Sequence, residues 1–312
     1  MRSTKRNQLT ILSLHRISNE NDYFFDPIRP DVFEELIKYA LKNYQIISFE
    51  ELSENKESYK KPPLIFSFDD GYYDFYEYAL PILVKYKLPS NHNIVNECVN
   101  SNSVIWTQRL NNIFNHCKNN NLELNFKTDE FDENITKSKN NWIQFYSKIF
   151  FHLSKLKKEQ RLKVIKHKED QLSISAECKM MSWEQIKECT KHDVEIGSHA
   201  YSHDSIPSIT DEDGLTFEIL HSKKEIEKHI ERPVSIIALP NGQGNVKVNE
   251  VVQRSGYRYL LYVNDTINNL KTISGKHLTI LNRVNLIDES IYEMILRTEL
   301  FHSKLRGLHG RL

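Results

Sequence analysis

The stretch PLIFSFDDGYYDFYEYALPIL, residues 63–83, joins a short apolar run to a pair of adjacent carboxylates. The run 64–68 has one serine among four apolar residues, and two prolines precede it. Apolar runs of this length with such flanks are typical of a buried strand. Asp69 and Asp70 come directly after the run, and the residues beyond Gly71 predict a helix over about 74–86 that Pro81 either kinks or breaks early. The two aspartates are therefore predicted at the carboxyl end of a strand.

Strand and helix patterns alternate along most of the chain. The predicted strands are 9–14, 45–48, 64–68, 194–197, 234–239, 257–263 and 278–286. The predicted helices are 31–42, 74–86, 182–191, 211–230, 247–255 and 288–305. Such alternation predicts an α/β fold with a mostly parallel sheet. About seven such units, with neither a G-x-G-x-x-G turn nor a P-loop, favour a TIM-like (β/α) barrel over an open nucleotide-binding sheet.

Residues 106–179 interrupt this alternation. Residues 118–141 are rich in Asn and Lys, and 142–170 predict one or two further helices. We interpret 106–179 as a helical insertion between two units of a single barrel domain that spans residues 1–312. The composition of the insertion does not distinguish a cap over a binding groove from a surface that binds a partner.

The overall composition excludes some classes of protein. Hydrophobic residues make up 39% of the 312 residues and charged residues 27%, which is the balance of a soluble globular protein. Lys plus Arg and Asp plus Glu both number 42, so no nucleic-acid partner is predicted. No segment approaches the ~20 apolar residues of a membrane helix, and residues 1–18 lack the pattern of a signal peptide. We therefore expect a cytoplasmic protein with reduced cysteines that meets a membrane only through a lipid-linked substrate.

A second polar motif follows another predicted strand. The segment VEIGSHAYSHDSI, residues 194–206, carries His199 and His203 directly after the strand 194–197. Their spacing of four predicts both rings on one side of a helical turn. Because the carboxyl ends of the strands form the functional face of a parallel barrel, we expect the histidines and the two aspartates on that same face.

Two adjacent carboxylates in such a place repel each other, and their desolvation adds to the cost. A bound cation offsets the repulsion and leaves one carboxylate free as a base. Two imidazoles and one carboxylate, with an open position for water, are common ligands of catalytic zinc. The alternative is that His199 and His203 are ordinary residues of a surface loop, but the two motifs together favour a metal site.

These motifs resemble those of the polysaccharide deacetylase family, the chitin-deacetylase-like carbohydrate esterase family 4. SFDDGYYD (67–74) is similar to the family's T-F-D-D-G block, and GSHAYSH (197–203) to its H-[ST]-x-x-[HN] block. ALPNG (238–242) takes the place of its proline-aromatic-glycine loop, while LSLHRIS (12–18) and MSWEQIKE (181–188) resemble a branch associated with bacterial surface-polysaccharide loci. The resemblance covers about residues 10–105 and 180–290 and leaves out the insertion.

The resemblance implies a distorted (β/α) barrel that hydrolyses an N-acetyl group of an amino sugar. It implies that Asp69 is the general base and that Asp70, His199 and His203 hold the metal. It also implies that the backbone N–H of Asn241 helps to bind the oxyanion. Zinc is the metal favoured by two histidines and one aspartate, although cobalt, nickel and iron fit the same ligands.

The sequence departs from the family pattern at three places. Ser67 replaces the usual Thr. Ala238 stands where an arginine often orients the catalytic aspartate; Arg283 is the candidate to supply this charge, and the alternative is an ordinary arginine at a strand end. The late Leu-x-His that supplies the general acid is not evident, because LNRVNL (281–286) occupies its place.

Other histidines and aromatic residues are candidates for the remaining roles. His15, on the first strand, is the candidate general acid, and its alternative is a structural or substrate-contacting role. His277 precedes its strand and is a weaker candidate; without any acid, Asp69 returns its own proton to the leaving amine. Tyr72 lies close enough to the aspartates to stack on a sugar, although most aromatic residues near it are expected in the core. His92, expected just after a strand, is another weaker site candidate.

The leading interpretation is a metal-dependent hydrolase that removes acetyl from an amino sugar of a surface polysaccharide or glycolipid precursor. A second interpretation is that the same metal-dependent hydrolysis removes a formyl group from a formamido sugar or an O-acetyl group, in either case on a lipid-linked sugar. A third is a non-catalytic sugar-binding barrel, indicated by Ala238 and by the missing late histidine. The intact aspartate pair and the His-x-x-x-His motif favour the enzyme, since a binding protein has no need of a spare base.

Overall fold

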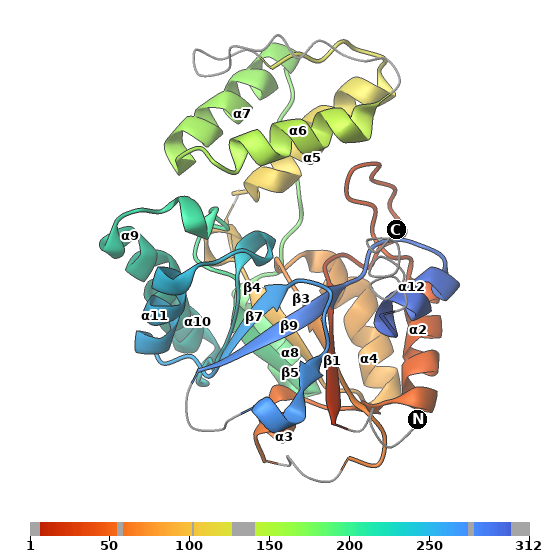
Figure 1. Ribbon diagram of the computed structural model, residues 1–312. Helices are drawn as coiled ribbons and strands as arrows, with labels where there is room; N and C mark the ends of the chain where they lie inside the picture. Colours follow the sequence, from red (N-terminus) through yellow and green to blue (C-terminus); the bar gives the residue numbers. More distant parts are fainter. Residues whose placement is uncertain (1–6, 55–58, 102, 127–140, 274–277, 301–312) are drawn as a thin grey trace, which may run out of the picture.

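Short apolar runs form the strands of a closed barrel in the computed structural model, which describes residues 7–54, 59–101, 103–126, 141–273 and 278–300 (Figure 1). Seven of the nine strands pair in parallel around a ring, which confirms the predicted (β/α) barrel. In order around the ring they are β1 (Gln8–Leu14), β3 (Pro63–Phe68), β4 (Ser90–Ile94), β5 (Val194–Ser198), β6 (Ile236–Ala238), β7 (Tyr259–Val263) and β9 (Thr279–Asn285). The ring closes because β1 pairs with β3 on one side and with β9 on the other. The short strands β2 (Gln45–Ile46) and β8 (Asn268–Asn269) pair with β3 and β1 outside the ring.

Side chains inside the barrel change from apolar to polar along the strands. Apolar residues of β1, β3, β6, β7 and β9 form one buried cluster at the amino-terminal end of the barrel, and α3 (Phe49–Glu54) adds Phe49 and Leu52 to it. Because alternate residues of a strand share a face, the same faces continue toward the carboxyl ends with Ser13, Ser67 and Arg283, all fully buried. This polar layer lies next to the strand ends that carry the aspartates.

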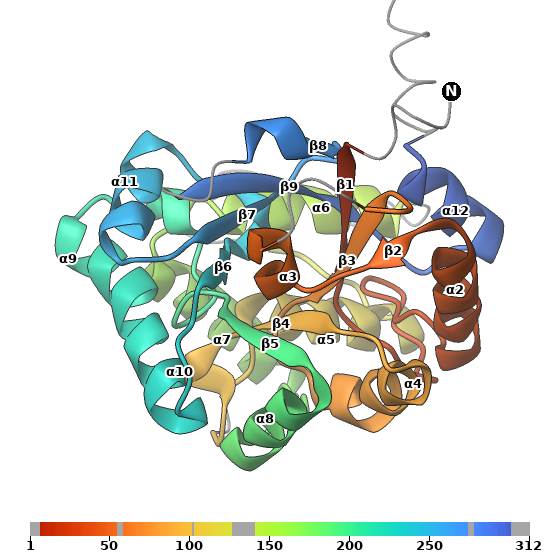
Figure 2. The same ribbon diagram turned by 90° about the horizontal axis from the view of Figure 1, so that it is seen from below.

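Helices cover the outside of the ring, as the view from below shows (Figure 2). They are α2 (Pro30–Asn43), α4 (Leu80–Tyr86), α8 (Trp183–Cys189), α9 (Glu212–Thr216), α10 (Ser222–Ile230), α11 (Val246–Arg254) and α12 (Ile291–Thr298). Buried residues of these helices and the outward side chains of the strands together form the main hydrophobic core. In the part of the chain that the structure describes, no helix has the length and hydrophobicity to cross a membrane.

The helix after the aspartates differs from the prediction around Pro81. A π-helical turn, Phe75–Ala79, precedes α4, and the N–H of Leu80 donates to the carbonyl of Phe75, five residues back. Proline lacks an N–H and its ring clashes with the carbonyl four residues earlier, so a widened turn just before it makes room for the ring. The irregularity therefore lies before Pro81, and Pro81 itself is part of the first turn of α4.

Other elements have different bounds from those predicted. The predicted helix 211–230 divides into α9, a π-helical turn at Phe217–His221 and α10. The predicted strand 234–239 shortens to β6. The last helix, α12, ends at Thr298, and the predicted residues 301–305 lie outside the described part of the chain.

The stretch 106–179 contributes helices between β4 and β5. They are α5 (Trp106–Asn119), α6 (Trp142–Leu153) and α7 (Lys158–Leu172). Figure 1 shows them stacked above the barrel, on the side opposite to α3. They share a hydrophobic cluster of their own, and Arg109 of α5 pairs with both carboxylate oxygens of Glu169 of α7 at 2.9 and 2.6 Å. The insertion therefore lies over the face of the barrel at which the strands end.

Candidate active site

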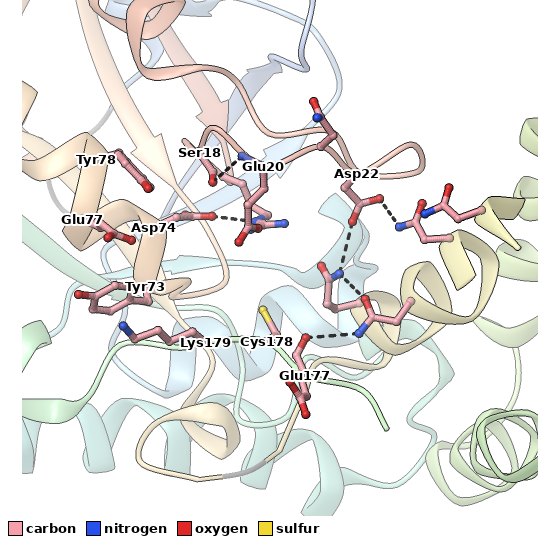
Figure 3. Close-up of a pocket in the computed structure, with 16 residues that line it drawn as sticks. Ser18, Glu20, Asp22, Tyr73, Asp74, Glu77, Tyr78, Glu177, Cys178 and Lys179 are labelled. Atoms are coloured by element: carbon pink, nitrogen blue, oxygen red, sulfur yellow. Dashed lines mark hydrogen bonds and ion pairs between the residues drawn. The ribbon is translucent and has the colours of Figure 1, made fainter. Parts of the chain in front are cut away.

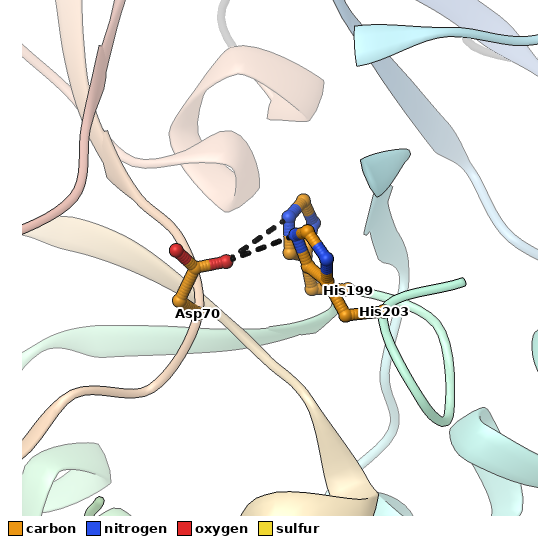
Figure 4. A group of neighbouring side chains, drawn as sticks. All are labelled: Asp70, His199 and His203. Atoms are coloured by element: carbon orange, nitrogen blue, oxygen red, sulfur yellow. Dashed lines mark ion pairs between the residues drawn. The ribbon is translucent and has the colours of Figure 1, made fainter. Parts of the chain in front are cut away.

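Asp70, His199 and His203 converge at the carboxyl ends of two strands. Asp70 follows β3, and the two histidines follow β5. The Nε2 atoms of both histidines lie 3.4 Å from the same oxygen of Asp70, Oδ1. All three residues are buried, and one candidate ligand atom from each lies within 4.8 Å of the others. Figure 4 shows both rings facing the carboxylate from one side.

This donor set fits a divalent cation. Asp70 Oδ1 is buried and, among the described residues, forms no hydrogen bond. The carbonyl oxygen of Ala238 lies 2.9 Å from His199 Nδ1, which favours the proton on Nδ1 and leaves the lone pair on Nε2. Burial lowers the pKa of His199 to about 4, so the ring stays neutral, which is the form that binds metal. Two imidazoles and a carboxylate with these properties suit a metal of the zinc class.

The prediction of a helical turn between the two histidines is wrong. Residues 199–205 form a loop in which Ala200 (φ 63°) and His203 (φ 57°) have left-handed backbone conformations. These reversals, and not helical periodicity, bring the ring centroids of His199 and His203 to 5.0 Å from each other. Neither position carries the glycine or asparagine that would indicate a left-handed residue in the sequence.

Asp69 has different partners from its neighbour Asp70. The guanidinium of Arg283, on β9, donates to both carboxylate oxygens of Asp69, at 2.8 and 2.7 Å. The side-chain amide of Asn93, on β4, donates to Asp69 Oδ1 at 2.7 Å. Burial by itself raises the pKa of Asp69, but the charge of Arg283 outweighs it and holds the pKa well below its usual range. Asp69 is therefore ionised and held in one orientation.

The remaining candidates lie around this centre. His15 Nε2 is 4.0 Å from Asp69 Oδ2, and the His15 side chain is 26% exposed. Asn241 follows β6 with a left-handed backbone (φ 57°), which asparagine tolerates better than most residues. Tyr72 is only 2% exposed, and its hydroxyl lies 3.3 Å from Gln108 Oε1, so a sugar reaches its ring only if neighbouring side chains move. His277 lies outside the described residues.

Sequence reasoning missed Asn93 and misplaced its neighbours. Residues 91–93 lie within β4 and not after a strand, and the interior polar layer runs through this strand. Asn91 Oδ1 accepts a hydrogen bond from Ser67 at 2.7 Å, and Asn93 holds Asp69. His92 points the other way, where its Nε2 accepts the N–H of Gly71 at 3.1 Å. The alternation of these residues on a strand was the available signal, because it places both asparagines on one face.

Two cavities lie beside Arg16, and the smaller one is also lined by His15. One of about 390 Å³ lies between the segment after β1, the turn after Gly71 and α5, and its lining is rich in carboxylate and amide side chains (Figure 3). Another of about 220 Å³ is lined by His15, Phe25 and residues that follow β9. Arg16 lines both cavities, and its guanidinium pairs with Asp74 at 2.7 Å. Polar space of this kind next to a reactive centre suits hydroxylated ligands.

Solved structures share this fold at low sequence identity. The deacetylase PplD of Streptococcus pyogenes, in complex with acetate, has a TM-score of 0.59 and 19% identity, over 93% of this chain and 98% of that chain. IcaB from Ammonifex degensii has a TM-score of 0.60 and 16% identity, over 94% of this chain and 97% of that chain. A polysaccharide deacetylase from Bacillus cereus has a TM-score of 0.61 and 16% identity, over 93% of this chain and 69% of that chain. At these identities the likeness shows the fold alone.

The sequence comparison is more specific. No curated protein is significantly similar to this chain in sequence. The sequence profile of the polysaccharide deacetylase family, however, matches residues 56–260. That match spans more than half of the chain and includes both the aspartate pair and the two histidines. The chain therefore belongs to the polysaccharide deacetylase family.

Proposed function

We propose that the chain is a metal-dependent hydrolase that removes the acetyl group from an N-acetylated amino sugar of a surface polysaccharide or glycolipid precursor. The observation that carries this proposal is that the two adjacent aspartates have different partners. One oxygen of Asp70 faces both histidines, whereas both oxygens of Asp69 are held by Arg283. One carboxylate is thus available to a metal, and the next one remains available for proton transfer.

The first half of the reaction uses these two carboxylates. Asp70, His199 and His203 would hold a divalent cation, which would polarise a carbonyl and lower the pKa of water. Asp69 takes a proton from the water that attacks the acetyl carbon. Because Arg283 keeps Asp69 ionised, the base is in its accepting form at physiological pH.

The second half breaks the carbon–nitrogen bond. The backbone N–H of Asn241 donates to the oxyanion while the acetyl carbon is tetrahedral. His15, 4.0 Å from Asp69, gives a proton to the leaving nitrogen, and the products are acetate and a free amine. Asp69 then passes the proton that it took from water to His15, directly or through solvent. Both residues thereby regain their starting protonation states.

The surroundings of the site support a glycan substrate. The polar cavity beside Arg16 and the smaller one beside His15 offer space on both sides of Arg16. This space exceeds what a single acetyl group needs, so we propose that sugars flanking the acetylated one bind there. The acetate bound to the similar structure from Streptococcus pyogenes supports acetyl transfer to water as the reaction class. We further propose that the metal is zinc, that the protein is cytoplasmic, and that its substrate is linked to a lipid at the membrane face.

Release of acetate from a panel of N-acetylated oligosaccharides tests the proposal. We expect the chelated protein to be inactive and added zinc to restore activity. Asp69→Asn should lower turnover by about 10²–10⁴-fold and still bind zinc. Asp70→Asn should lose both turnover and zinc binding. Release of acetate from O-acetylated sugars alone would show that the enzyme cuts an ester bond. Release of formate from formamido sugars would show that it removes a formyl group instead of an acetyl group. Sugar binding without any turnover would contradict the enzyme and favour a binding protein.

A further inference from the structure

The helices of the insertion contact the loop that carries His203. We propose that Arg161 and Trp106 are positioning residues that hold His203 in the place where it meets Asp70, an inference that rests on the metal-dependent function proposed above. Neither residue touches Asp70 or Asp69, so each acts through the loop.

Two buried interactions join the insertion to this loop. The indole N–H of Trp106, the first residue of α5, donates to the carbonyl oxygen of His203 at 3.1 Å. Arg161, on α7, forms an ion pair with Asp204, the residue after His203. Trp106 is 3% exposed and Arg161 is 1% exposed. Competition from water is therefore weak at both contacts.

The two side chains also support each other. The Arg161 guanidinium lies over the Trp106 ring, 4.8 Å from its centroid, and the same ring stacks on Phe150 of α6 at 5.3 Å. Two nitrogens of Arg161, Nε and Nη1, are buried without hydrogen bonds among the described residues. The partners that compensate the charge of Arg161 are therefore the carboxylate of Asp204 and the face of the indole ring. All three insertion helices therefore contribute to one rigid support behind the loop.

The loop needs such support because its backbone is strained. Left-handed conformations are unfavourable for residues that carry a Cβ, and both Ala200 and His203 adopt one. Such conformations persist only where the surrounding contacts over-determine them. Without contacts at its second half, the loop would relax and His203 would leave its place beside Asp70.

Among the described residues, the hydrogen bonds that connect the barrel to this loop are made by its first half. Glu218, in the π-helical turn before α10, accepts the backbone N–H groups of Tyr201 and Ser202 at 3.0 and 2.9 Å and the Ser202 hydroxyl at 2.5 Å. The carbonyl of His203 and the side chain of Asp204 are instead bonded to the insertion. The half of the loop that carries the second histidine therefore depends on α5 and α7.

Matched variants of the full-length protein test this inference. Arg161→Met removes the ion pair with Asp204, and Trp106→Phe removes one hydrogen-bond donor while it keeps an aromatic ring. The control is Arg109→Met, which breaks the partly buried pair between α5 and α7 and, among the described residues, removes no hydrogen bond to the loop. Zinc affinity is measured by competition with a chelator, and hydrogen exchange of the peptide that covers residues 199–206 is measured in the metal-free protein.

We expect zinc affinity to fall by about 10–100-fold in Arg161→Met and by about tenfold in Trp106→Phe, as for other residues that orient metal ligands. Exchange in 199–206 should be faster in both, and Arg109→Met should leave affinity and local exchange unchanged. Equal losses in Arg161→Met and Arg109→Met would overturn the inference, because the insertion would then act only through general stability. Unchanged affinity and exchange would overturn it as well.

The same measurements separate this inference from the proposed function. If the wild-type protein binds no divalent metal, the metal-dependent function fails. The exchange data on the metal-free protein then decide by themselves whether Arg161 and Trp106 hold the loop. Trp106→Phe keeps the test conclusive if Arg161→Met fails to fold, since it removes a single donor.

Discussion

Arg283 on β9 donates to both carboxylate oxygens of Asp69 at the end of β3, at 2.8 and 2.7 Å. The two residues are 214 positions apart in the chain. They meet because β3 and β9 both pair with β1 when the barrel closes. A carboxylate bound by both terminal nitrogens of a buried guanidinium keeps one orientation and stays ionised. The pair therefore orients a reactive group and also links the two strands that flank β1.

Arg283→Met should destabilise the protein strongly. It leaves the buried carboxylate of Asp69 without its opposite charge, which costs about 3–5 kcal/mol in the free energy of unfolding. The control is Arg254→Met, which breaks a pair with Glu212 in which the Arg254 side chain is 61% exposed, and which should cost at most about 1 kcal/mol. Urea unfolding of both variants measures the difference. Similar losses in the two variants would show that burial of the pair between Asp69 and Arg283 does not increase its contribution to the free energy of unfolding.

Metal should stabilise the fold through Asp70. A ligand that binds only the folded state raises the free energy of unfolding, by about 2.7 kcal/mol when its concentration is a hundred times Kd. We expect zinc added to the chelated protein to raise the melting temperature, and Asp70→Asn to abolish the rise. Asp193→Asn, at an exposed left-handed turn before β5, serves as the control and should keep the rise. A rise that persists in Asp70→Asn would place the metal elsewhere.

His15 should matter most when the leaving group needs a proton. His15→Gln should lower kcat for an N-acetyl sugar by about 10²-fold, in the range of general acid catalysis. With an aryl acetate as substrate, kcat of His15→Gln should fall much less, because a phenolate leaves without protonation. His192→Gln alters a half-exposed histidine beside Glu188 and should change neither rate. Equal losses on the amide and on the aryl ester would exclude His15 as the acid.

Gly197 should tolerate no side chain. A Cβ at this residue of β5 would lie 2.2 Å from Asn93 Oδ1, and Asn93 is the amide that donates to Asp69. Gly197→Ala should therefore cost about 1–3 kcal/mol of stability, as overpacking does, and also lower kcat. The control is Gly256→Ala, which meets no atom within 4 Å but has φ +72°. It should lose about 1 kcal/mol with kcat intact, and a normal kcat in Gly197→Ala would contradict the role of Asn93.

Glu195 should make stability depend on pH. It lies on β5, where it accepts the N–H groups of Phe49 and Glu50, and burial raises its pKa from 4.5 to about 7. The folded protein thus holds this proton more tightly than the unfolded chain, so the free energy of unfolding falls as pH rises from 4.5 to about 7. Glu195→Gln should remove this fall. Denaturant unfolding of both proteins across that range measures it, and a constant difference in stability would contradict the prediction.

The sequence by itself determined the class of fold. Strand length, flanking turn residues and helical periodicity act over a few neighbouring residues, so the (β/α) barrel and six of its seven ring strands could be predicted without knowledge of long-range contacts. The ring strand β4 was not among the predicted strands, and the predicted strand 45–48 is β2, outside the ring. The same local patterns predicted that Asp69, Asp70 and His199 stand directly after strands. Family membership follows from the same two motifs, and the match over residues 56–260 confirms it.

Only the tertiary structure decided which side chains meet. The pairing of Asp69 with Arg283, which the sequence offered only as one of two alternatives, depends on barrel closure, and its pairing with Asn93 depends on the register of β4. The left-handed backbone of His203 has no glycine to indicate it, because contacts from distant helices maintain it. Loop conformation and charge pairing are set by packing between segments far apart in the chain, which is why the sequence predicted the elements and the face of the site and left the individual contacts to the tertiary structure.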